Sequence, residues 1–357
     1  MHSIPLVRSL WGQPFLDFFR EIGAPVDERL EDSKLPAELE ETPERPCPSR
    51  PLYDLIDRLV DDAGVSDVGL KVGARTRIRS LGGFGHEVAN AATLGNAIRT
   101  AQRLMPAVHT GRALTLSCDG PRARLSSRLD EAQLSPSPWD DHFVLWLMID
   151  LVGMAAGRGW RPEAVAIQTP EFNGLRDCAP LANARIRCGA DNTMVTFPRA
   201  LLRQPLTSGR AAVSVSESSN HGRFDATPLP TEFTPSLQAV LECLVAGDSS
   251  DLATASAIVG TSRRTLQRQL HASGDTFSAV LARARLDRAR GLLDETSFRV
   301  IDIAFEVGYS DHAHFTKAFR RWMGVTPQAY RSEAGVPVPV LQSGLAAATT
   351  RAMARPA

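Results

Sequence analysis

Two short rows of polar side chains have the residue types that bind the edges of nucleic-acid bases. Arginine and lysine donate hydrogen bonds to guanine, glutamine pairs with adenine, and serine, threonine and arginine hold phosphates. The first row contains Arg263, Arg264, Gln267, Arg268 and His271, and the second contains His312, Thr316, Lys317, Arg320 and Arg321. Both rows therefore indicate DNA recognition by hydrogen bonding, without covalent chemistry.

Each row lies on the second helix of a helix, tight turn, helix pattern. In the first pattern, Ser256 is followed four residues later by Gly260 at the turn, and Leu266 faces back into the core. In the second pattern, Ala304 is the small residue, Gly308 lies at the turn and Phe315 faces the core. A small residue lets two helices cross closely, and glycine permits the turn backbone. The second helix of each pair would then present its polar side outward.

The elements around these rows are predicted to be helical throughout. Apolar spacing predicts helices at residues 237–244, 252–259, 262–272, 277–293, 301–307 and 311–322, and a short last helix begins at Pro327. The expected N-caps are Ser262, Ser310 and Thr326. A helix over residues 277–293 would span about 25 Å. With the widths of the flanking helices, it could hold two recognition helices about 34 Å apart, one turn of DNA.

Positive charge gathers in the same region. Between residues 262 and 290 there are seven arginines and two aspartates, a local charge of +5. The arginines are Arg263, Arg264, Arg268, Arg283, Arg285, Arg288 and Arg290. Arg285 is predicted to be a buried, paired structural arginine, because its spacing to Leu281, Ala289 and Leu292 turns it partly inward. Phe315, Phe319 and Trp322 share one helical face and are predicted to be core residues.

At these residues the chain closely resembles the AraC/XylS transcription regulators. The stretches that carry the resemblance are S-R-R-T-L-Q-R-Q-L, R-L-D-R-A-R-G-L-L and I-A-F-E-V-G-Y-S-D-H-A-H-F-T-K-A-F-R-R-W-M-G-V-T-P-Q-A-Y-R, within residues 232–331. The resemblance implies a double helix-turn-helix domain that binds promoter DNA. By position in the motif, base contacts fall on Arg264, Gln267, Arg268, His312, Ala313, Thr316 and Lys317, and Arg263 completes the predicted binding set. Ala313 could contact only a thymine methyl group.

The N-terminal part reads as a mixture of helices and short strands. Helices are predicted at residues 52–63, 91–104 and 141–156. Strands are predicted at residues 113–118, 123–129, 164–168, 184–188 and 194–197, and the first two flank the hairpin signal Asp119-Gly120. This pattern favours a small sandwich or barrel that could enclose a ligand. The fold class of the whole chain is therefore predicted to be α+β, with an all-α C-terminal domain.

The N-terminal part is also similar to the effector-binding domain of one AraC-type branch. The matching runs are V-G-L-K-V-G near Val68, L-G-G-F-G-H-E-V-A-N-A-A-T-L-G-N-A-I-R from Leu81, and T-F-P-R-A-L-L-R-Q-P-L from Thr196. That branch includes regulators of amino-acid, amine and virulence genes. The similarity implies a sensor that dimerises and binds an amino acid, an amine or another metabolite.

Composition divides the chain and excludes several classes. A stretch rich in Ser, Gly, Pro and Thr predicts a linker at 206–231, between an effector-binding and dimerisation domain at 1–205 and a DNA-binding domain at 232–335. A flexible tail is predicted at 336–357. The 357 residues carry 40 Lys+Arg and 40 Asp+Glu, and 43% of them are hydrophobic, which is typical of a globular protein.

Targeting and metal signals are missing from the sequence. No apolar run approaches the roughly 20 residues needed to cross a bilayer. Residues 1–20 lack an uninterrupted apolar segment and an A-x-A site, so they predict no signal peptide. The five cysteines are scattered without C-x-x-C spacing, which predicts neither a metal site nor a disulfide framework. We therefore expect a cytoplasmic protein with no cofactor, no metal and no membrane partner.

Two alternatives to a ligand-responsive regulator are a DNA-repair enzyme and a DNA-binding dimer that senses no ligand. A DNA-repair alkyltransferase with an AraC-type domain needs a reactive cysteine beside histidine and arginine, and Cys47 in R-P-C-P-S-R lacks that setting. No G-x-S-x-G, P-loop or H-E-x-x-H motif is present, so we expect no enzyme. A DNA-binding dimer that senses no ligand stays open. Trp139, Phe143 and Trp146 could line a pocket but are predicted to be core or dimer-interface residues. His86 is predicted to be a surface histidine or one with its hydrogen bonds satisfied, and not a ligand-binding group.

These observations predict a metabolite-responsive activator. A homodimer would place its DNA-binding domains on two promoter half-sites and contact RNA polymerase. The effector must bind one arrangement of the dimer better than another, because equal affinity would shift nothing.

Overall fold

The protein is described here by a computed structural model that covers residues 4–33, 35, 39–40, 42–65, 67–130, 137–157, 159–170, 178–207, 224–245 and 250–333. Most of the predicted linker and the whole of the predicted tail lie outside these residues. The chain forms two compact units, Met1–Leu281 and Ala282–Ala357, and each is described by itself. The division between them falls within helix α11 (Phe277–Glu295).

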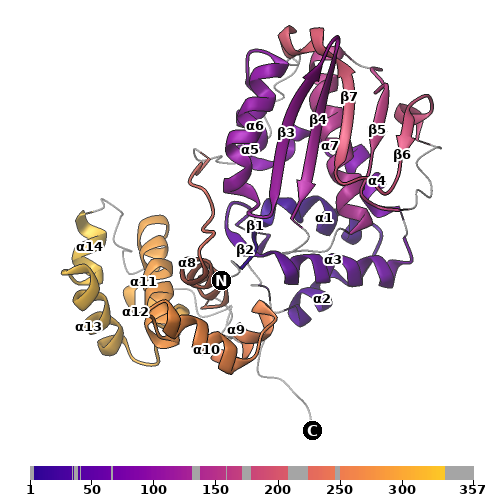
Figure 1. Ribbon diagram of the computed structural model, residues 1–357. Helices are drawn as coiled ribbons and strands as arrows, with labels where there is room; N and C mark the ends of the chain where they lie inside the picture. Colours follow the sequence, from indigo (N-terminus) through magenta and orange to yellow (C-terminus); the bar gives the residue numbers. More distant parts are fainter. Residues whose placement is uncertain are drawn as a thin grey trace. The chain divides into compact units, whose positions relative to one another are not determined.

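A five-stranded sheet forms one layer of the first unit (Figure 1). Its order is β3-β4-β7-β5-β6, and only β5 and β6 run parallel. The strands are β3 (Arg112–Asp119), β4 (Arg122–Leu129), β5 (Ala164–Ala166), β6 (Arg185–Arg187) and β7 (Thr193–Pro198). Gly120, directly after Asp119, has a φ of 54° and turns the chain between β3 and β4. All five predicted strands are confirmed.

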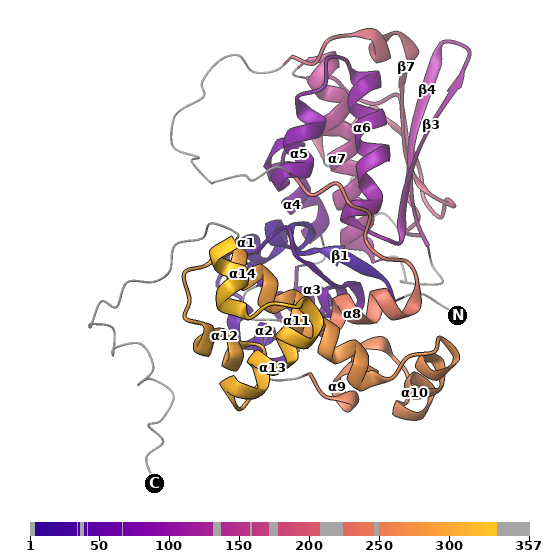
Figure 2. The ribbon, with the colours of Figure 1, turned by 90° about the vertical axis from the view of Figure 1, so that its left-hand side faces the viewer.

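Among the described residues, helices cover one face of this sheet and none covers the other. Helices α6 (Leu94–Val108) and α7 (Pro138–Ala156) lie against the inner face (Figure 2). Along β4 burial alternates, with Ala123 and Leu125 buried towards the helices and Arg122 exposed on the other face. The prediction of a sandwich or barrel is wrong. Because α7 is buried around most of its circumference, a helix fills the place of a second sheet.

Five further α-helices and one pair of strands belong to the sensor part of this unit. Helix α3 (Ser49–Ala63), like α6 and α7, was predicted. The elements without a predicted counterpart are β1 (Leu6–Arg8), β2 (Pro46–Pro48), α1 (Gln13–Glu21), α2 (Val26–Asp32), α4 (Val68–Arg75) and α5 (Gly82–Ala89). Strands β1 and β2 pair antiparallel in a separate sheet. Short 3-10 helices lie at Ser9–Trp11, Ile78–Ser80, Ala179–Leu181 and Arg199–Arg203.

Two glycines explain how α4 packs so closely against α7. A Cβ built on Gly69 would lie 2.1 Å from the backbone oxygen of Trp139, and one on Gly73 would lie 2.6 Å from the Trp146 Cβ. No side chain fits at such distances, so both positions need glycine. The V-G-L-K-V-G run is therefore a helix-packing surface.

The C-terminal helices match the predicted series. The first unit contains α8 (Phe233–Val245), α9 (Leu252–Val259), α10 (Arg263–Ala272) and the start of α11. The second contains the rest of α11, α12 (Val300–Glu306), α13 (His312–Met323) and α14 (Pro327–Glu333). Among the described residues, no helix is both long enough and apolar enough to span a membrane.

Candidate nucleic-acid interface

Helices α9 and α10 form the first helix-turn-helix pair. The Asp251 carboxylate accepts hydrogen bonds from the Ala253 and Thr254 amides and caps α9, and Gly260 ends that helix with a φ of 70°. Ser262 Oγ accepts a hydrogen bond from the Thr265 amide at 3.1 Å and starts α10. The turn is fixed at both ends, as the sequence predicts.

Helix α10 exposes the predicted reading face. Leu266 and Leu270 are fully buried on its other side. Its exposed residues include Arg263, Arg264, Gln267 and Arg268, at the first, second, fifth and sixth positions of the helix, and His271 in its last turn. Within the part of the chain that the structure describes, the side chains of Arg264, Gln267 and Arg268 make no hydrogen bond or ion pair. The helix N-terminus adds partial positive charge, so this end of α10 suits a phosphate backbone or a guanine edge.

Helices α12 and α13 form the second pair, with one correction to its capping. Gly308 has a φ of 75° and closes α12. Asp311, and not the predicted Ser310, caps α13, because its carboxylate accepts the Ala313 amide at 2.9 Å. Helix α13 begins one residue later than predicted, and aspartate is as good an N-cap as serine. Phe315 and Phe319 are each 1% exposed and hold α13 in the core.

The predicted contact residues of α13 occupy the same helical positions as those of α10. His312, Ala313, Thr316 and Lys317 are its first, second, fifth and sixth residues. His312, Ala313 and Lys317 are exposed, whereas Thr316 is half-buried and its Oγ1 is buried without a partner among the described residues. The two helices thus carry one pattern twice, and Thr316 is the member least available to a ligand.

Trp322 does not belong to the core as the sequence predicts. It is 44% exposed, and the Arg321 guanidinium lies 6.0 Å from the centre of its ring. The helical spacing places Trp322 on the face of Phe315 and Phe319, but it is the second-last residue of α13. The residues that pack over this face of α13 end before the helix does. Trp322 is therefore exposed, although it lies on the same face as the buried phenylalanines.

Two arginines of α11 turn away from solvent. Arg285 is half-buried with its guanidinium 5.4 Å from the centre of the Tyr309 ring, and its Nε has no hydrogen-bond acceptor in the described chain. The predicted inward direction of Arg285 is right. Its guanidinium lies near an aromatic ring, where a cation–π interaction takes the place of the expected charged partner. Arg288 is 6% exposed, which the sequence analysis missed. The positive surface of this region is therefore smaller than the arginine count suggests.

In the sensor part, a buried ion pair links the sheet to α7. Arg112 and Asp140 pair through Nη2 and Oδ2, and their side chains are 1% and 3% exposed. Asp140 Oδ1 also accepts the Trp11 indole N–H at 3.1 Å and the Tyr53 hydroxyl at 3.0 Å. Arg112 Nη1 donates to Ser127 Oγ at 2.9 Å. One carboxylate therefore joins four segments that are far apart in sequence.

His109 extends this network as a neutral ring. Its Nδ1 accepts the Gly111 amide at 3.1 Å, and its Nε2 lies 3.3 Å from the Tyr53 oxygen. The Tyr53 hydroxyl donates its hydrogen bond to Asp140, so its oxygen is free to accept one from His109. Because Nδ1 is an acceptor, the ring proton of His109 is on Nε2 and points to the Tyr53 oxygen. Burial, and then the nearby Arg112 charge, hold the pKa of His109 well below 6.5.

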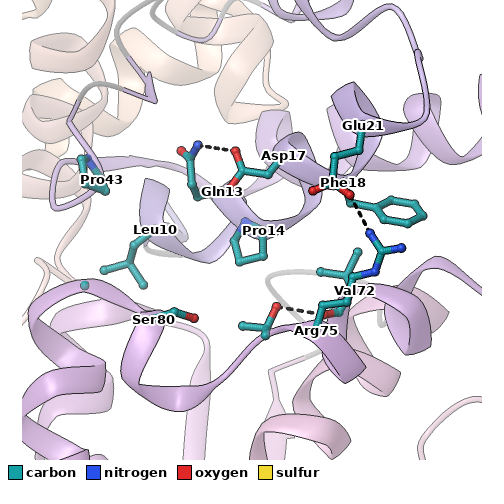
Figure 3. Close-up of a pocket in the computed structure, with 12 residues that line it drawn as sticks. Leu10, Gln13, Pro14, Asp17, Phe18, Glu21, Pro43, Val72, Arg75 and Ser80 are labelled. Carbon is teal, nitrogen blue, oxygen red and sulfur yellow. Dashed lines mark hydrogen bonds and ion pairs between the residues drawn. The ribbon is translucent and has the colours of Figure 1, made fainter. Parts of the chain in front are cut away.

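A cleft between α1 and α4 has most of its polar groups already paired (Figure 3). It has a volume of about 340 Å³. Arg75 donates to Glu21 at 2.7 Å and lies 5.3 Å from the centre of the Phe18 ring. Gln13 donates to Asp17 at 3.0 Å. This cleft offers a ligand few free donors.

A larger cleft of about 1080 Å³ runs along α7. Trp146, Ile149 and Met154 form part of its lining, and Asp150 and Arg161 are among its charged groups. Burial raises the pKa of Asp150, against the opposing effects of the Ile78 amide and Arg77. Of the three aromatic residues considered from sequence, Trp139 and Phe143 are core, whereas Trp146 is 9% exposed and reaches the cleft. His86 is exposed, as predicted.

Two family profiles cover most of the chain. The arabinose-binding N-terminal domain of AraC transcription regulators matches residues 23–206, more than half of the chain, and a helix-turn-helix domain matches residues 255–333. The chain belongs to the AraC family. It is a DNA-binding transcription regulator with an N-terminal ligand-binding domain.

Individual relatives of this AraC-family chain are also regulators. The ornithine utilization regulator of Pseudomonas aeruginosa is 25% identical over 75% of this chain and 79% of its own. The transcriptional activator NphR of Rhodococcus sp. is 32% identical over 37% of each chain. The crystal structure of the transcriptional regulator CdpR from Pseudomonas aeruginosa aligns over 88% of this chain and 98% of its own, with 19% identity and a TM-score of 0.34.

Sequence reasoning on this AraC-family regulator missed the residues of the sensor network. Arg112, Asp140, Tyr53 and His109 lie on different elements, and no local spacing connects them. One signal was present: Asp140 and Asp141 begin a helix that is apolar on every side. Charged residues on such a helix become buried and need partners, so they were candidates for a network.

Proposed function

We propose that this AraC-family regulator is a cytoplasmic, metabolite-responsive activator that binds DNA as a homodimer. Each chain would place α10 and α13 in successive major grooves of a promoter half-site, and the bound dimer would contact RNA polymerase. The chain would act through binding, with no catalytic step.

The observation that carries this proposal is the repeated pattern on the two helices. Arg264 and Ala313, Gln267 and Thr316, and Arg268 and Lys317 occupy equivalent positions. The N-terminal half of a recognition helix is the part that contacts base edges. Our proposed contacts are Arg263, Arg264, Gln267, Arg268, His312, Ala313, Thr316 and Lys317, with the smallest share for Thr316 because its hydroxyl is buried.

The proposed division of labour follows the predicted domains, with sensing and dimerisation in 1–205, a linker at 206–231 and DNA binding in 232–335. The named relative concerned with ornithine utilization supports an amino acid, an amine or another metabolite as effector. The effector would bind one arrangement of the dimer more tightly and so shift it towards the DNA-bound form.

Single substitutions test the proposed contacts on an operator fragment. Arg268→Ala should weaken binding by about 1–3 kcal/mol and relax specificity at one base position. Arg185→Ala is the matched control, because Arg185 is an exposed arginine on β6 of the sensor sheet. Affinities for a panel of single-base operator variants would be measured at about 0.15 M salt. If Arg268→Ala binds as tightly as Arg185→Ala, the proposed register of α10 is wrong.

A further inference from the structure

The cleft along α7 is built on one face of that helix. Ile149, Asp150, Gly153 and Met154 come three, four, seven and eight residues after Trp146, which is the spacing of one helical face, and all five residues line the cleft. Gly153 keeps the middle open, because a Cβ at this position would meet nothing within 4 Å. Its volume of about 1080 Å³ lies at the upper end of the range for small-molecule sites.

The floor and wall of the cleft suit a flat or branched apolar group. Trp146 is fixed in place, because Gly73 admits its ring against α4 and only 9% of the residue is exposed. Ile149 is 7% exposed beside it on the helix, and Trp160 lines the cleft from the segment after α7. Two indole rings and an aliphatic residue offer a large contact area at low cost in side-chain entropy.

The polar groups of the cleft have donors to spare. Arg161 lines the cleft and has no hydrogen-bond or ion-pair partner among the described residues. The Trp146 indole N–H is also buried without an acceptor in that part of the chain. A ligand with a negative charge and acceptor oxygens would pair with Arg161, and a carboxylate does so in a planar form that matches guanidinium.

Asp150 limits how much negative charge the ligand can carry. Its Oδ2 accepts the Ile78 amide at 2.9 Å, and its Oδ1 lies 3.7 Å from Arg77 Nε. Its side chain is 18% exposed, so it is weakly screened. A second carboxylate on the ligand would face repulsion here, whereas an amino group would be accepted.

We propose that this cleft binds a small monocarboxylate with an aromatic or branched aliphatic body, including α-amino acids of that kind. Arg161 would hold the carboxylate, and Trp146, Ile149 and Trp160 would contact the apolar body. The identification of this ligand as the effector rests on the function proposed above; the binding site itself does not.

Four probes that share a phenyl group test the proposed ligand chemistry. Phenylacetate, L-phenylalanine, phenethylamine and phenylmalonate would be titrated into the full chain, without DNA, by calorimetry and ligand-observed NMR. Phenylacetate and L-phenylalanine should bind, and phenethylamine and phenylmalonate should bind at least about tenfold more weakly. Phenethylamine binding as tightly as phenylacetate, or no binding of either acid at about 10 mM, would overturn the proposal.

Two variants tie the binding to this cleft. Arg161→Gln should weaken phenylacetate binding about 10- to 100-fold, as expected for the loss of a charged hydrogen bond. Gly153→Leu should abolish it by filling the cleft. Gly291→Leu is the matched control, because Gly291 is also within a helix and a Cβ there meets nothing within 4 Å. Circular dichroism would show that all three variants fold, and unchanged affinity in Gly153→Leu would refute the site.

The outcomes separate this inference from the proposed function. Probe binding is measured without DNA, and operator binding is measured without probe. If the acids bind and the operator test fails, the cleft assignment stands and the regulator proposal falls. If the operator test succeeds and no acid binds, the cleft assignment alone falls.

Discussion

Asp140→Ala should be among the most destabilising single substitutions in the sensor part of the chain. The change removes the carboxylate that pairs with Arg112 and accepts hydrogen bonds from the Trp11 indole and the Tyr53 hydroxyl. Arg112 would keep its charge, because a guanidinium does not lose its proton in a protein. The variant would therefore hold an unpaired buried cation.

The expected loss follows from the burial of both partners. Their side chains are 1% and 3% exposed, and breaking a pair at such a site costs about 3–5 kcal/mol. The two neutral donors add about 1 kcal/mol each. Because whole domains are stable by only about 5–15 kcal/mol, the variant should lose a third or more of its stability. Asp140→Asn keeps an acceptor oxygen and should lose less.

Urea unfolding followed by tryptophan fluorescence would measure these changes. With a slope of about 1–3 kcal/mol per molar urea, the Asp140→Ala midpoint should fall by about 1 M or more. The control is Glu21→Ala, which breaks the Glu21–Arg75 pair. These side chains are 64% and 61% exposed, so the control should lose under about 1 kcal/mol.

A double variant separates the charge from the packing. Arg112→Met together with Asp140→Leu removes both charges and fills much of the same space, so it should recover most of the stability lost in Asp140→Ala. The reasoning would be refuted if Asp140→Ala cost no more than Glu21→Ala, or if the double variant were less stable than Asp140→Ala.

Two further predictions concern pH and the turns. The pKa of His109 is held below 6.5, so the unfolded chain binds its proton more readily and the free energy of unfolding should fall below about pH 6.5, by up to about 1.4 kcal/mol per pH unit. His109→Asn should reduce that slope in urea unfolding between pH 7 and 5, and an unchanged slope would contradict the assignment. Gly308→Ala should cost more than Gly260→Ala in thermal unfolding, although both glycines have positive φ. A Cβ at Gly308 would lie 3.1 Å from Arg285 Nη2, whereas one at Gly260 has no neighbour nearer than 3.9 Å. Equal costs would show that the Arg285 contact does not matter.

The C-terminal helices could be predicted from sequence because their signals are local. Apolar spacing, capping residues and turn glycines all lie within a few residues of the structure they determine. Gly260 and Ser262 mark both ends of one turn, and the structure places them there. The errors came from limits of the same local reasoning: Ser310 and Asp311 are both good caps, and the face of Trp322 says nothing about where the core ends.

The sensor part was less predictable because its structure depends on distant residues. Helix α4 contains Gly69 and Gly73, which lower helix propensity, and only their contacts with Trp139 and Trp146 explain them. The open sheet depends on α7 covering its inner face, which strand patterns alone do not reveal. The alternation of β4 was readable from sequence, but the insertion of β5 between β7 and β6 was not.

The candidate contact residues could be proposed from sequence because exposed polar faces repeat with the helix. The sequence could not show that Arg288 is buried or that the Thr316 hydroxyl has no route to solvent. Both depend on neighbouring helices of the packed domain. The α7 cleft also depends on packing, since its charged and aromatic lining comes from separate segments.

Selection of genomic DNA fragments by the purified protein tests the central claim most directly. The full chain and the double variant Arg268→Ala/Lys317→Ala would be compared at about 0.15 M salt, where nonspecific phosphate binding is reduced. The account predicts a recurring site with two half-sites for the parent chain and loss of that site in the folded variant. The same enrichment by both proteins, or no enrichment by the parent with or without cell metabolite extract, would contradict it.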